Sequence, residues 1–174
     1  MSAVGVREAP AARSLTEGEP RRRRLALVAS KGTLDGAYPP LILATTAASL
    51  GWEVGIFFTF YGLDILHRKR HRKLKVPALG NPAMPVPVPS LVGALPGMTG
   101  VATAMMKRWM GRSKMPTVPE FLDLARESGV RLIACSTTMG VMGIGKEDLV
   151  EGADIAGATA FLEFAADADV SLFV

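Results

Sequence analysis

The sequence predicts a single α/β domain built on an open parallel sheet with helices on both faces. Short apolar runs alternate along the chain with segments of helical pattern, which is typical of βαβ units. The length of 174 residues suits one domain better than two. Hydrophobic residues make up 49% of the chain, enough for a core, so intrinsic disorder of the whole chain is excluded.

The predicted elements follow from two patterns. Unbroken apolar runs predict buried strands, and apolar residues at helical spacing predict helices. In chain order we expect a strand at 25–30, a helix at 38–50, a strand at 52–58, a helical turn at 61–66, helices at 101–110 and 117–128, a strand at 130–135, helices at 146–150 and 155–166, and a strand at 168–174. Such a sheet is of the flavodoxin- or Rossmann-like kind.

The first strand and helix are marked by the residues at their ends. The apolar run at 25–30 opens into a loop with two glycines at 30–36. Pro39 and Pro40 suit the first turn of the following helix, where no backbone N–H donor is needed, and Gly51 ends that helix. The β-branched and aromatic residues that come next predict the second strand.

The second half of the chain repeats this alternation. Thr117 and Glu120 have the spacing of a capping box and open a helix whose apolar stripe stops at Gly129. The next apolar run ends at Cys135, the single cysteine of the chain. A loop of Ser, Thr, Gly and Met residues follows it, and the remaining helices and strand complete the pattern.

A stretch rich in proline and methionine interrupts the alternation between the second and third strands. Six prolines within residues 76–96 exclude a helix or a central strand there. A long apolar loop in a compact domain usually covers a pocket or an oligomer interface. We therefore predict a domain at 24–174 with an insertion at about 67–116, preceded by a disordered leader at 1–23.

Positive charge is concentrated in two short runs. The net charge is +4, and residues 21–24 and 67–75 hold half of the twenty Lys and Arg residues. Basic patches attract anionic partners such as a protein, a lipid surface or a nucleic acid, although a solvated surface is the simplest interpretation. We do not expect nucleic-acid binding, because no aromatic residues interleave with the basic ones.

The cysteine and histidine content excludes several kinds of site. One cysteine cannot form an intramolecular disulfide or a multi-cysteine zinc site, and it favours a reducing, cytoplasmic setting. Both histidines lie in a basic run, so no metal or other cofactor is expected. The longest apolar window, 41–61, contains Glu53 and divides into a helix and a strand, so no integral membrane segment is expected.

Three strand ends are expected to meet at the carboxyl edge of the sheet, where open parallel sheets bind ligands. Backbone N–H groups after Cys135 would stabilise its thiolate and lower its pKa, and a nearby Lys31 would do the same. The alternative is a cysteine that only packs in the core. The candidate nucleophile is Cys135, and the candidate residues for binding a substrate or anion are Ser30, Lys31, Thr59, Ser136, Thr137 and Thr138.

These motifs and their order resemble the DsrE/DsrF-like sulfur-relay family, over nearly all of residues 24–174. The likeness is carried by residues 25–36, 38–41, 51–54, 57–63, 151–163 and 168–174, and above all by Cys135-Ser-Thr-Thr-Met-Gly-Val-Met-Gly-Ile144. In the related motif a serine stands at Thr138 and an acidic residue at Gly140. Some relatives carry a second cysteine; its absence here excludes a resolving dithiol step within one subunit, but not pairing between two subunits.

The resemblance implies a cytoplasmic, homo-oligomeric protein whose cysteine, here Cys135, accepts sulfane sulfur as a persulfide. The partners it implies are a low-molecular-weight sulfane sulfur donor and a small TusA-type carrier, and the activity is that of a sulfurtransferase. The run at 67–75 would then be a docking patch for an acidic carrier or an anionic donor. One alternative is a non-catalytic paralogue that acts as a scaffold; another is an anion- or nucleotide-binding module using the loop at 30–36, although that loop lacks P-loop order.

Overall fold

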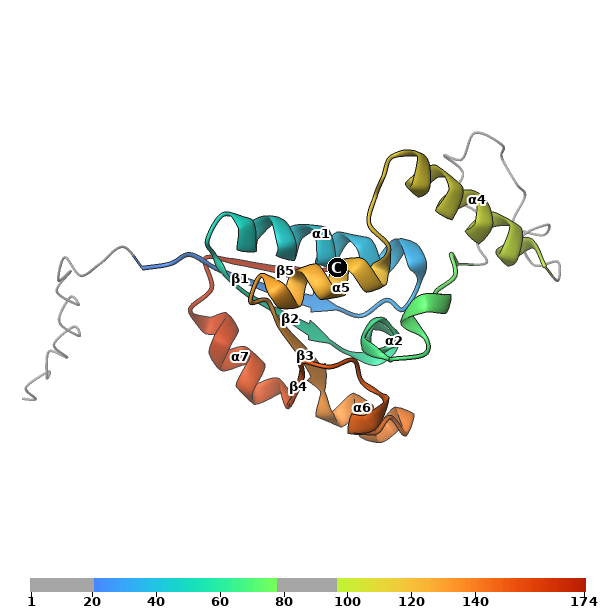
Figure 1. The fold of residues 1–174 in the computed structure, drawn as a ribbon. Helices are drawn as coiled ribbons and strands as arrows, with labels where there is room; N and C mark the ends of the chain where they lie inside the picture. The colour runs from blue at the N-terminus through green and yellow to red at the C-terminus, as the bar shows by residue number, and fades with distance from the viewer. Residues whose placement is uncertain (1–20, 78–96) are drawn as a thin grey trace, which may run out of the picture.

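The computed structural model describes residues 21–77 and 97–174, and within them five parallel strands form one sheet (Figure 1). Its strand order is β4-β3-β2-β1-β5. The strands are β1 (Arg24–Ala29), β2 (Glu53–Phe58), β3 (Arg131–Cys135), β4 (Ala153–Ala156) and β5 (Val170–Phe173). The predicted single α/β domain with an open parallel sheet is confirmed. The predictions for residues 1–20 and 78–96 lie outside the described residues.

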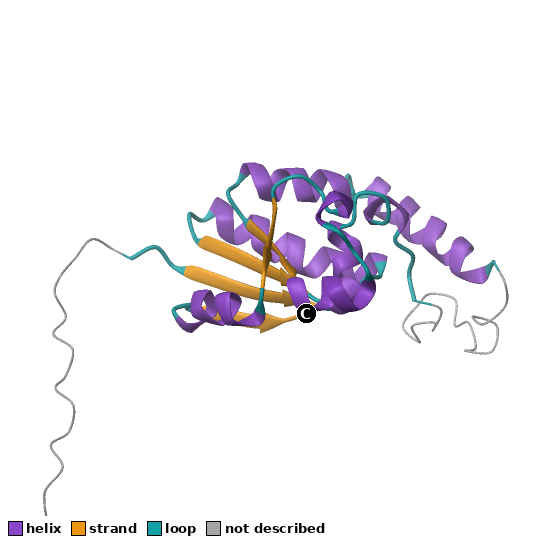
Figure 2. Cartoon of the chain, turned by 90° about the horizontal axis from the view of Figure 1, so that it is seen from below, coloured by secondary structure: helices purple, strands orange, loops and turns teal. Residues whose placement is uncertain are grey.

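Helices cover both faces of the sheet (Figure 2). Helices α1 and α5 pack on one face, and α7 packs on the other. In chain order the helical elements are α1 (Leu34–Ser49), η1 (Phe60–Gly62), α2 (Leu63–Leu66), η2 (His71–Lys73), α4 (Met98–Arg112), α5 (Val118–Glu127), α6 (Ser136–Met142), η3 (Lys146–Asp148) and α7 (Ala158–Ala166), where η marks a 3₁₀ turn.

Alternate residues of each central strand point to opposite faces, as a pleated strand requires. In β3, Leu132 and Ala134 join the core under α1 and α5. Ile133 and Cys135 join a second core cluster under α7. The single cysteine therefore lies on the face that is covered by α7.

The start predicted for the first helix is wrong by one turn. Helix α1 begins at Leu34, so Pro39 and Pro40 lie inside it. Thr33 caps the extra turn, because its hydroxyl oxygen accepts a hydrogen bond of 3.3 Å from the Gly36 N–H. Leu34 is buried in the core, so its burial also favours the earlier start.

Strand β4 was not predicted, and its last residues were assigned to the following helix. The strand covers Ala153–Ala156, and α7 begins only at Ala158. Asp154 and Ile155 are exposed, because β4 is an edge strand with little cover. Such a strand lacks the unbroken apolar run that marks the central strands.

Helix α4 extends away from the body of the domain (Figure 1). The segment before it contacts the helix through Val76, whose backbone N–H donates to the Thr103 hydroxyl oxygen (3.1 Å). This hydroxyl in turn donates to the Thr99 carbonyl within the helix (2.7 Å). After the helix, the Tyr38 hydroxyl donates to the Pro116 carbonyl (3.1 Å). No helix in the described part of the chain has the length and apolar character needed to cross a membrane.

The basic run at 67–75 is not uniformly solvated, because both of its histidines are buried. The ring Nδ1 of His71 donates to the His67 carbonyl (2.7 Å), and the backbone N–H of Lys69 donates to Nδ1 of His67 (3.2 Å). Burial lowers the pKa of His67, and the charge of Arg70 lowers it further. The imidazoles thus act as packed structural groups between the exposed Arg and Lys side chains.

Candidate functional site

The ends of three strands meet at the carboxyl edge of the sheet. The register pairs Phe58 with both Ala29 and Ala134, so the residues that follow these three positions lie side by side. Those residues are Ser30, Thr59 and Cys135, and the N–H of Thr59 donates to the Ala29 carbonyl (3.0 Å). The predicted convergence of the strand ends is therefore present.

Cys135 is the last residue of β3 and the N-cap residue of α6. The residue is only 6% exposed, and its side chain belongs to the core cluster that includes Ile133, Phe57 and Phe161. The two aromatic rings stack with their centroids 4.8 Å apart. The thiol therefore has an apolar surround on the side of α7.

Hydrogen-bond donors offset the effect of this burial on the thiol. Burial raises the pKa of Cys135, whereas the hydroxyl and amide of Thr138, the hydroxyl of Thr59 and the amide of Thr137 lower it, and the net pKa lies below the ordinary thiol value. As the N-cap residue, Cys135 makes no side-chain capping hydrogen bond to the backbone of α6. These donors favour the thiolate, which is the reactive form.

The two threonine hydroxyls are themselves connected. Oγ1 of Thr59 lies 3.0 Å from Oγ1 of Thr138. A hydroxyl has one proton, so when one of the pair donates to the other, only the acceptor's proton is free to point at the sulfur. This bond also connects η1 to α6, because Thr59 is the N-cap residue of η1 and Thr138 lies in α6.

The other predicted site residues are placed less closely around the sulfur. Thr137 acts on it through its amide, and its side chain is exposed. Ser136 faces the start of α7, since a Cβ on Gly157 would lie 3.8 Å from its Oγ. Ser30 and Lys31 follow β1, with β2 between them and Cys135, and neither is among the groups that shift the thiol pKa.

Two exposed aromatic side chains follow Thr59, and an exposed valine lies in α6; none of them was among the predicted site residues. Phe60, Tyr61 and Val141 are 62%, 68% and 78% exposed. Phe60 has a left-handed backbone with φ of 46°, an uncommon conformation for an aromatic residue. The aromatic run ending in Phe60-Tyr61-Gly62 was visible in the sequence, but its exposure depends on tertiary packing.

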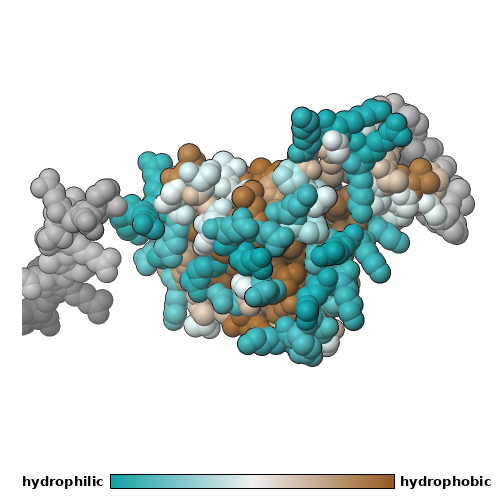
Figure 3. Space-filling model, in the orientation of Figure 1, coloured by the Kyte–Doolittle hydropathy of each residue, from teal (hydrophilic) through white to brown (hydrophobic). Residues whose placement is uncertain are grey.

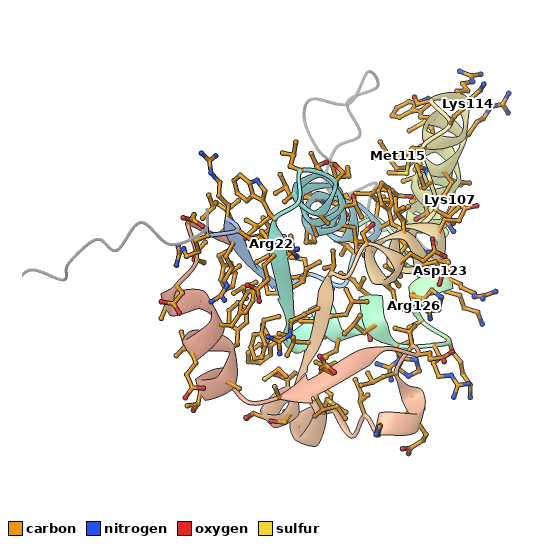
Figure 4. All side chains as sticks on the ribbon, turned by 60° about the vertical axis from the view of Figure 1, so that its left-hand side comes forward. Arg22, Lys107, Lys114, Met115, Asp123 and Arg126 are labelled. Carbon is orange, nitrogen blue, oxygen red and sulfur yellow. The ribbon has the colours of Figure 1, made fainter. Side chains whose placement is uncertain are left out.

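A second region with titratable groups lies on the opposite face, under α5. A cavity of about 240 Å³ is lined by Arg68, Arg72, Arg126, Asp123 and Glu151, among others. Figure 4 shows Asp123 and Arg126 on the same side of the molecule as Lys107. Arg126 pairs with Asp123 at 3.2 Å, and Arg68 donates to the Glu147 carbonyl at 2.9 Å. Three of these five charged side chains are thus engaged within the chain, and the cavity holds no nucleophile, so the thiol edge is the candidate site.

The arrangement at this edge is suited to nucleophilic chemistry of sulfur. It combines a thiol of lowered pKa with hydroxyl and amide donors and an apolar surround. Within residues 21–77 and 97–174, no three His, Cys, Asp or Glu side chains come together to hold a metal ion. The chemistry that these residues can perform is attack on an electrophilic sulfur atom.

Comparisons with known proteins agree with the fold and with the sequence motifs. The sequence model of the DsrE/DsrF/DrsH-like family matches residues 21–173. The protein named sulfur carrier protein DsrE2 from Allochromatium vinosum is 46% identical over 159 residues, covering 88% of this chain and 99% of that protein. The uncharacterized protein YrkE from Bacillus subtilis is 30% identical over 155 residues, covering 87% of this chain and 97% of that protein.

A solved structure shows the same fold at low sequence identity. The crystal structure of the ychN protein from E. coli matches with a TM-score of 0.54 and 13% identity. The match covers 87% of this chain and 99% of that chain. At this identity the likeness concerns the fold alone.

Proposed function

The chain belongs to the DsrE/DsrF/DrsH-like family, and we propose that it is a cytoplasmic sulfur-relay protein that carries sulfane sulfur as a persulfide on Cys135. The observation that carries the proposal is the place of the single cysteine, at the carboxyl edge of the sheet where β3 passes into α6, beside the hydrogen-bonded pair of Thr59 and Thr138. The groups around it also lower the pKa of its thiol. The 46% identical relative named as a sulfur carrier protein supports the same role. The acceptor that we propose is a small TusA-type carrier protein.

Loading of Cys135 requires a thiolate and an anionic sulfane sulfur donor. The thiolate attacks the outer sulfur of a polysulfide, a new S–S bond forms on Sγ, and the donor's S–S bond breaks. Its electron pair leaves with the shortened polysulfide, so no external oxidant or reductant is needed. The product is Cys135–S–S⁻, one sulfur atom heavier than the thiolate.

The residues around the sulfur have separate roles in this step. The amides of Thr137 and Thr138, together with the hydroxyl of the Thr59–Thr138 pair whose proton is free, stabilise negative charge, first on Sγ and then on the outer sulfur. Ser30 and Lys31, one strand further along the edge, attract the anionic donor. The apolar cluster under α7 limits contact of the persulfide with water and oxidants.

Unloading is the reverse exchange with a different thiol. The acceptor's thiolate attacks the outer sulfur of the persulfide, and the bond between the two sulfurs breaks. The electron pair returns to Sγ of Cys135, and the acceptor leaves as a persulfide. Because the lowered pKa makes Cys135 a good leaving group, the same donors that favour loading also favour this step.

Mass spectrometry after brief exposure to equimolar polysulfide near neutral pH tests the proposal. We expect a mass increase of about 32 Da on the wild type, one sulfur atom, and none on Cys135→Ser. The sharper control is the Cys135→Ser/Ser136→Cys variant, which moves the thiol to the neighbouring exposed position. We expect the native thiol to react faster although it is more buried, because the relocated thiol loses its donors.

Equal loading of the two thiols would contradict activation by the site. A wild type that binds a TusA-type carrier but takes up no sulfur would instead be the non-catalytic paralogue that acts as a scaffold. The two outcomes are separated by measuring loading and carrier binding on the same preparation.

A further inference from the structure

We propose that the space between η2, α4 and α5 binds an amphipathic organic anion, in which a phosphate or carboxylate group carries an apolar chain. Two cavities form this site. The first, which we call the charged cavity, has a volume of about 240 Å³ and lies under α5 beside Arg68 and Arg72. The second, the methionine groove, has a volume of about 250 Å³ and lies between α1 and α4 beside Met110 and Met115. The site goes beyond the proposed function, because Cys135 belongs to the opposite face of the sheet.

The two cavities adjoin one another. His71, Arg72 and Pro119 line both of them, so η2 and the start of α5 form a common wall. Figure 4 shows Lys107 of the methionine groove on the same side of the molecule as Arg126 of the charged cavity. Taken together, the cavities reach the volume of about 300–1,000 Å³ that is usual for small-molecule sites. One ligand can therefore extend from the charged cavity into the groove.

The methionine groove suits an apolar chain. Its apolar lining residues are Leu34, Tyr38, Met110, Met115, Val118 and Pro119. The Tyr38 hydroxyl donates to the Pro116 carbonyl, so the polar end of this side chain is satisfied and its ring serves as an apolar wall. Methionine side chains are flexible and adapt to ligands of different shape. Burial of a chain against these residues would supply the apolar part of the binding energy.

The charge of the groove defines the other end of the ligand. Its two charged lining residues, Arg72 and Lys107, are both basic and exposed. Neither forms an ion pair with another residue in the described part of the chain. A second copy of the chain docked here in a symmetric dimer would bring two such basic faces together, and like charges repel. The charge therefore favours an anionic ligand over a second copy.

The charged cavity continues this basic wall. Arg68 donates one N–H to a backbone carbonyl, which leaves its charge without a counter-ion. Arg126 is paired with Asp123 at 3.2 Å, and Glu151 also lines the cavity. With Arg72, the three guanidinium groups outnumber the two carboxylates. The planar guanidinium group binds phosphate and carboxylate with two parallel hydrogen bonds, so these are the anionic groups that fit.

A buried histidine stands in the wall between the two cavities. His71 is only 7% exposed, and its ring Nδ1 donates to the His67 carbonyl (2.7 Å). Its other ring nitrogen, Nε2, makes no hydrogen bond within residues 21–77 and 97–174, yet no fully buried side-chain nitrogen there lacks a partner. Nε2 therefore opens toward the cavities that His71 lines. A ligand oxygen would satisfy it, as a donor to the neutral ring or as an acceptor from the charged one.

The test titrates the full chain with decyl phosphate below its critical micelle concentration, and with inorganic phosphate and decanol as its two halves. We expect isothermal titration calorimetry at constant ionic strength to show decyl phosphate binding at least about tenfold more tightly than either half, because it occupies both cavities. The chain has two histidines, so imidazole NMR gives an independent measurement. The signals of the His71 ring should shift more than those of the His67 ring.

Two pairs of variants locate the bound probe. Arg72→Gln and Met110→Ser each remove a lining side chain, and we expect decyl phosphate to bind about tenfold more weakly to both. Lys73→Gln removes the neighbouring exposed charge and Met105→Ser another half-buried methionine of α4. Both should bind within about twofold of the wild type. Unfolding midpoints show which variants keep their fold, and the exposed Arg72 carries the test if Met110→Ser does not.

The source of the ligand is distinguished by a further arm with phosphatidic acid in phosphatidylcholine vesicles. Binding to these vesicles that is lost in Arg72→Gln would support the site with a lipid headgroup as its ligand. Binding of decyl phosphate as a monomer, with no binding to vesicles, would support it with a soluble anion.

Three outcomes would overturn the inference. Equal affinity for decyl phosphate and decanol, or an equal loss in Lys73→Gln and Arg72→Gln, would show adsorption without a defined site. A wild type that binds none of the probes would show that no ligand of this class enters the groove. Sedimentation that reveals a dimer, dissociated by Met110→Ser and by decyl phosphate, would identify the groove as an interface between two copies of the chain.

Discussion

The two faces of the sheet differ in how completely they are covered. Helices α1 and α5 bury one face under a core cluster that draws on most elements of the domain. On the other face α7 covers a small cluster, and beside it lies a cavity of about 610 Å³ where Phe173 is 73% exposed. In Figure 3 hydrophobic residues reach the surface in separate areas between hydrophilic ones.

This difference shows where a reactive group fits in such a fold. Cys135 belongs to the thinly covered face and lies at its carboxyl end, where donors from the end of β2 and from the first turn of α6, which the sequence analysis had assigned to a loop, act on the sulfur. On the thickly covered face the same strand carries Leu132 and Ala134, which only pack. Stability and chemistry are therefore assigned to opposite faces of one strand.

The largest effect that we expect tests this assignment with neighbouring residues of β3. Leu132 and Ile133 are both buried, one on each face. Leu132→Ala should lower the free energy of unfolding by about 2–5 kcal/mol, since the surrounding core cannot collapse into the cavity. Ile133→Ala should cost less, because its smaller cluster under a single helix relaxes more easily.

Urea denaturation of both variants measures the difference, provided that the m-values stay equal. If Ile133→Ala lowered the free energy of unfolding as much as Leu132→Ala or more, the two faces of the sheet would not differ in how easily they relax around a cavity.

An intermediate effect is expected from the threonines that follow Cys135. Thr138→Val removes a hydroxyl that lowers the thiol pKa, so the pKa rises and the thiolate fraction at a given pH below it falls. We expect alkylation by iodoacetamide near pH 7 to slow about tenfold, with the midpoint of the pH–rate profile shifted upward. Thr137→Val should leave both unchanged, because Thr137 acts through its backbone amide.

The two valine variants also test what lowers the thiol pKa on the thinly covered face. An equal slowing in both would show that the lowered pKa comes from the general environment rather than from the Thr138 hydroxyl. A change in Thr138→Val alone, with the unfolding midpoint preserved, would show that the reactivity of this face depends on a polar contact and not on its packing.

The sequence was sufficient for the features that depend on local pattern. The central strands were found because they are buried on both faces and form unbroken apolar runs. Cys135 and Thr59 were proposed as site residues because the carboxyl ends of parallel strands meet at one edge, and the structure does place their strand ends side by side. Edge strand β4 was missed, since its exposed Asp154 and Ile155 remove that pattern.

Other features depend on contacts between distant segments. Helix α1 starts one turn earlier than predicted because Thr33 caps it and Leu34 is buried. The two prolines had indicated the later start, since proline is typical of the first turn of a helix. The left-handed Phe60 follows from the close approach of Gly62 to the Ala29 carbonyl. Spacing alone could not show that Thr59 and Thr138, far apart in sequence, would share a hydrogen bond.

The smallest effect that we expect concerns the strained turn that follows β2 at the carboxyl edge of the sheet. In Phe60→Gly the left-handed backbone costs nothing, a gain of about 1–2 kcal/mol, offset by about 0.5–1 kcal/mol of added chain entropy in the unfolded state. The free energy of unfolding should therefore stay equal or rise slightly. Tyr61→Gly, at a position without positive φ, gains nothing and should lower it by about 0.5–1 kcal/mol.

Thermal or urea unfolding compares the two glycine variants, and transfer of sulfur to the carrier is measured on the same samples. If Phe60→Gly were clearly less stable than Tyr61→Gly, the ring would be contributing to packing despite its exposure. A Phe60→Gly protein that is as stable as the wild type but slow in sulfur transfer would show that the ring acts in transfer and not in packing. The turn would then keep a strained backbone because the exposed ring serves binding and not the stability of the fold.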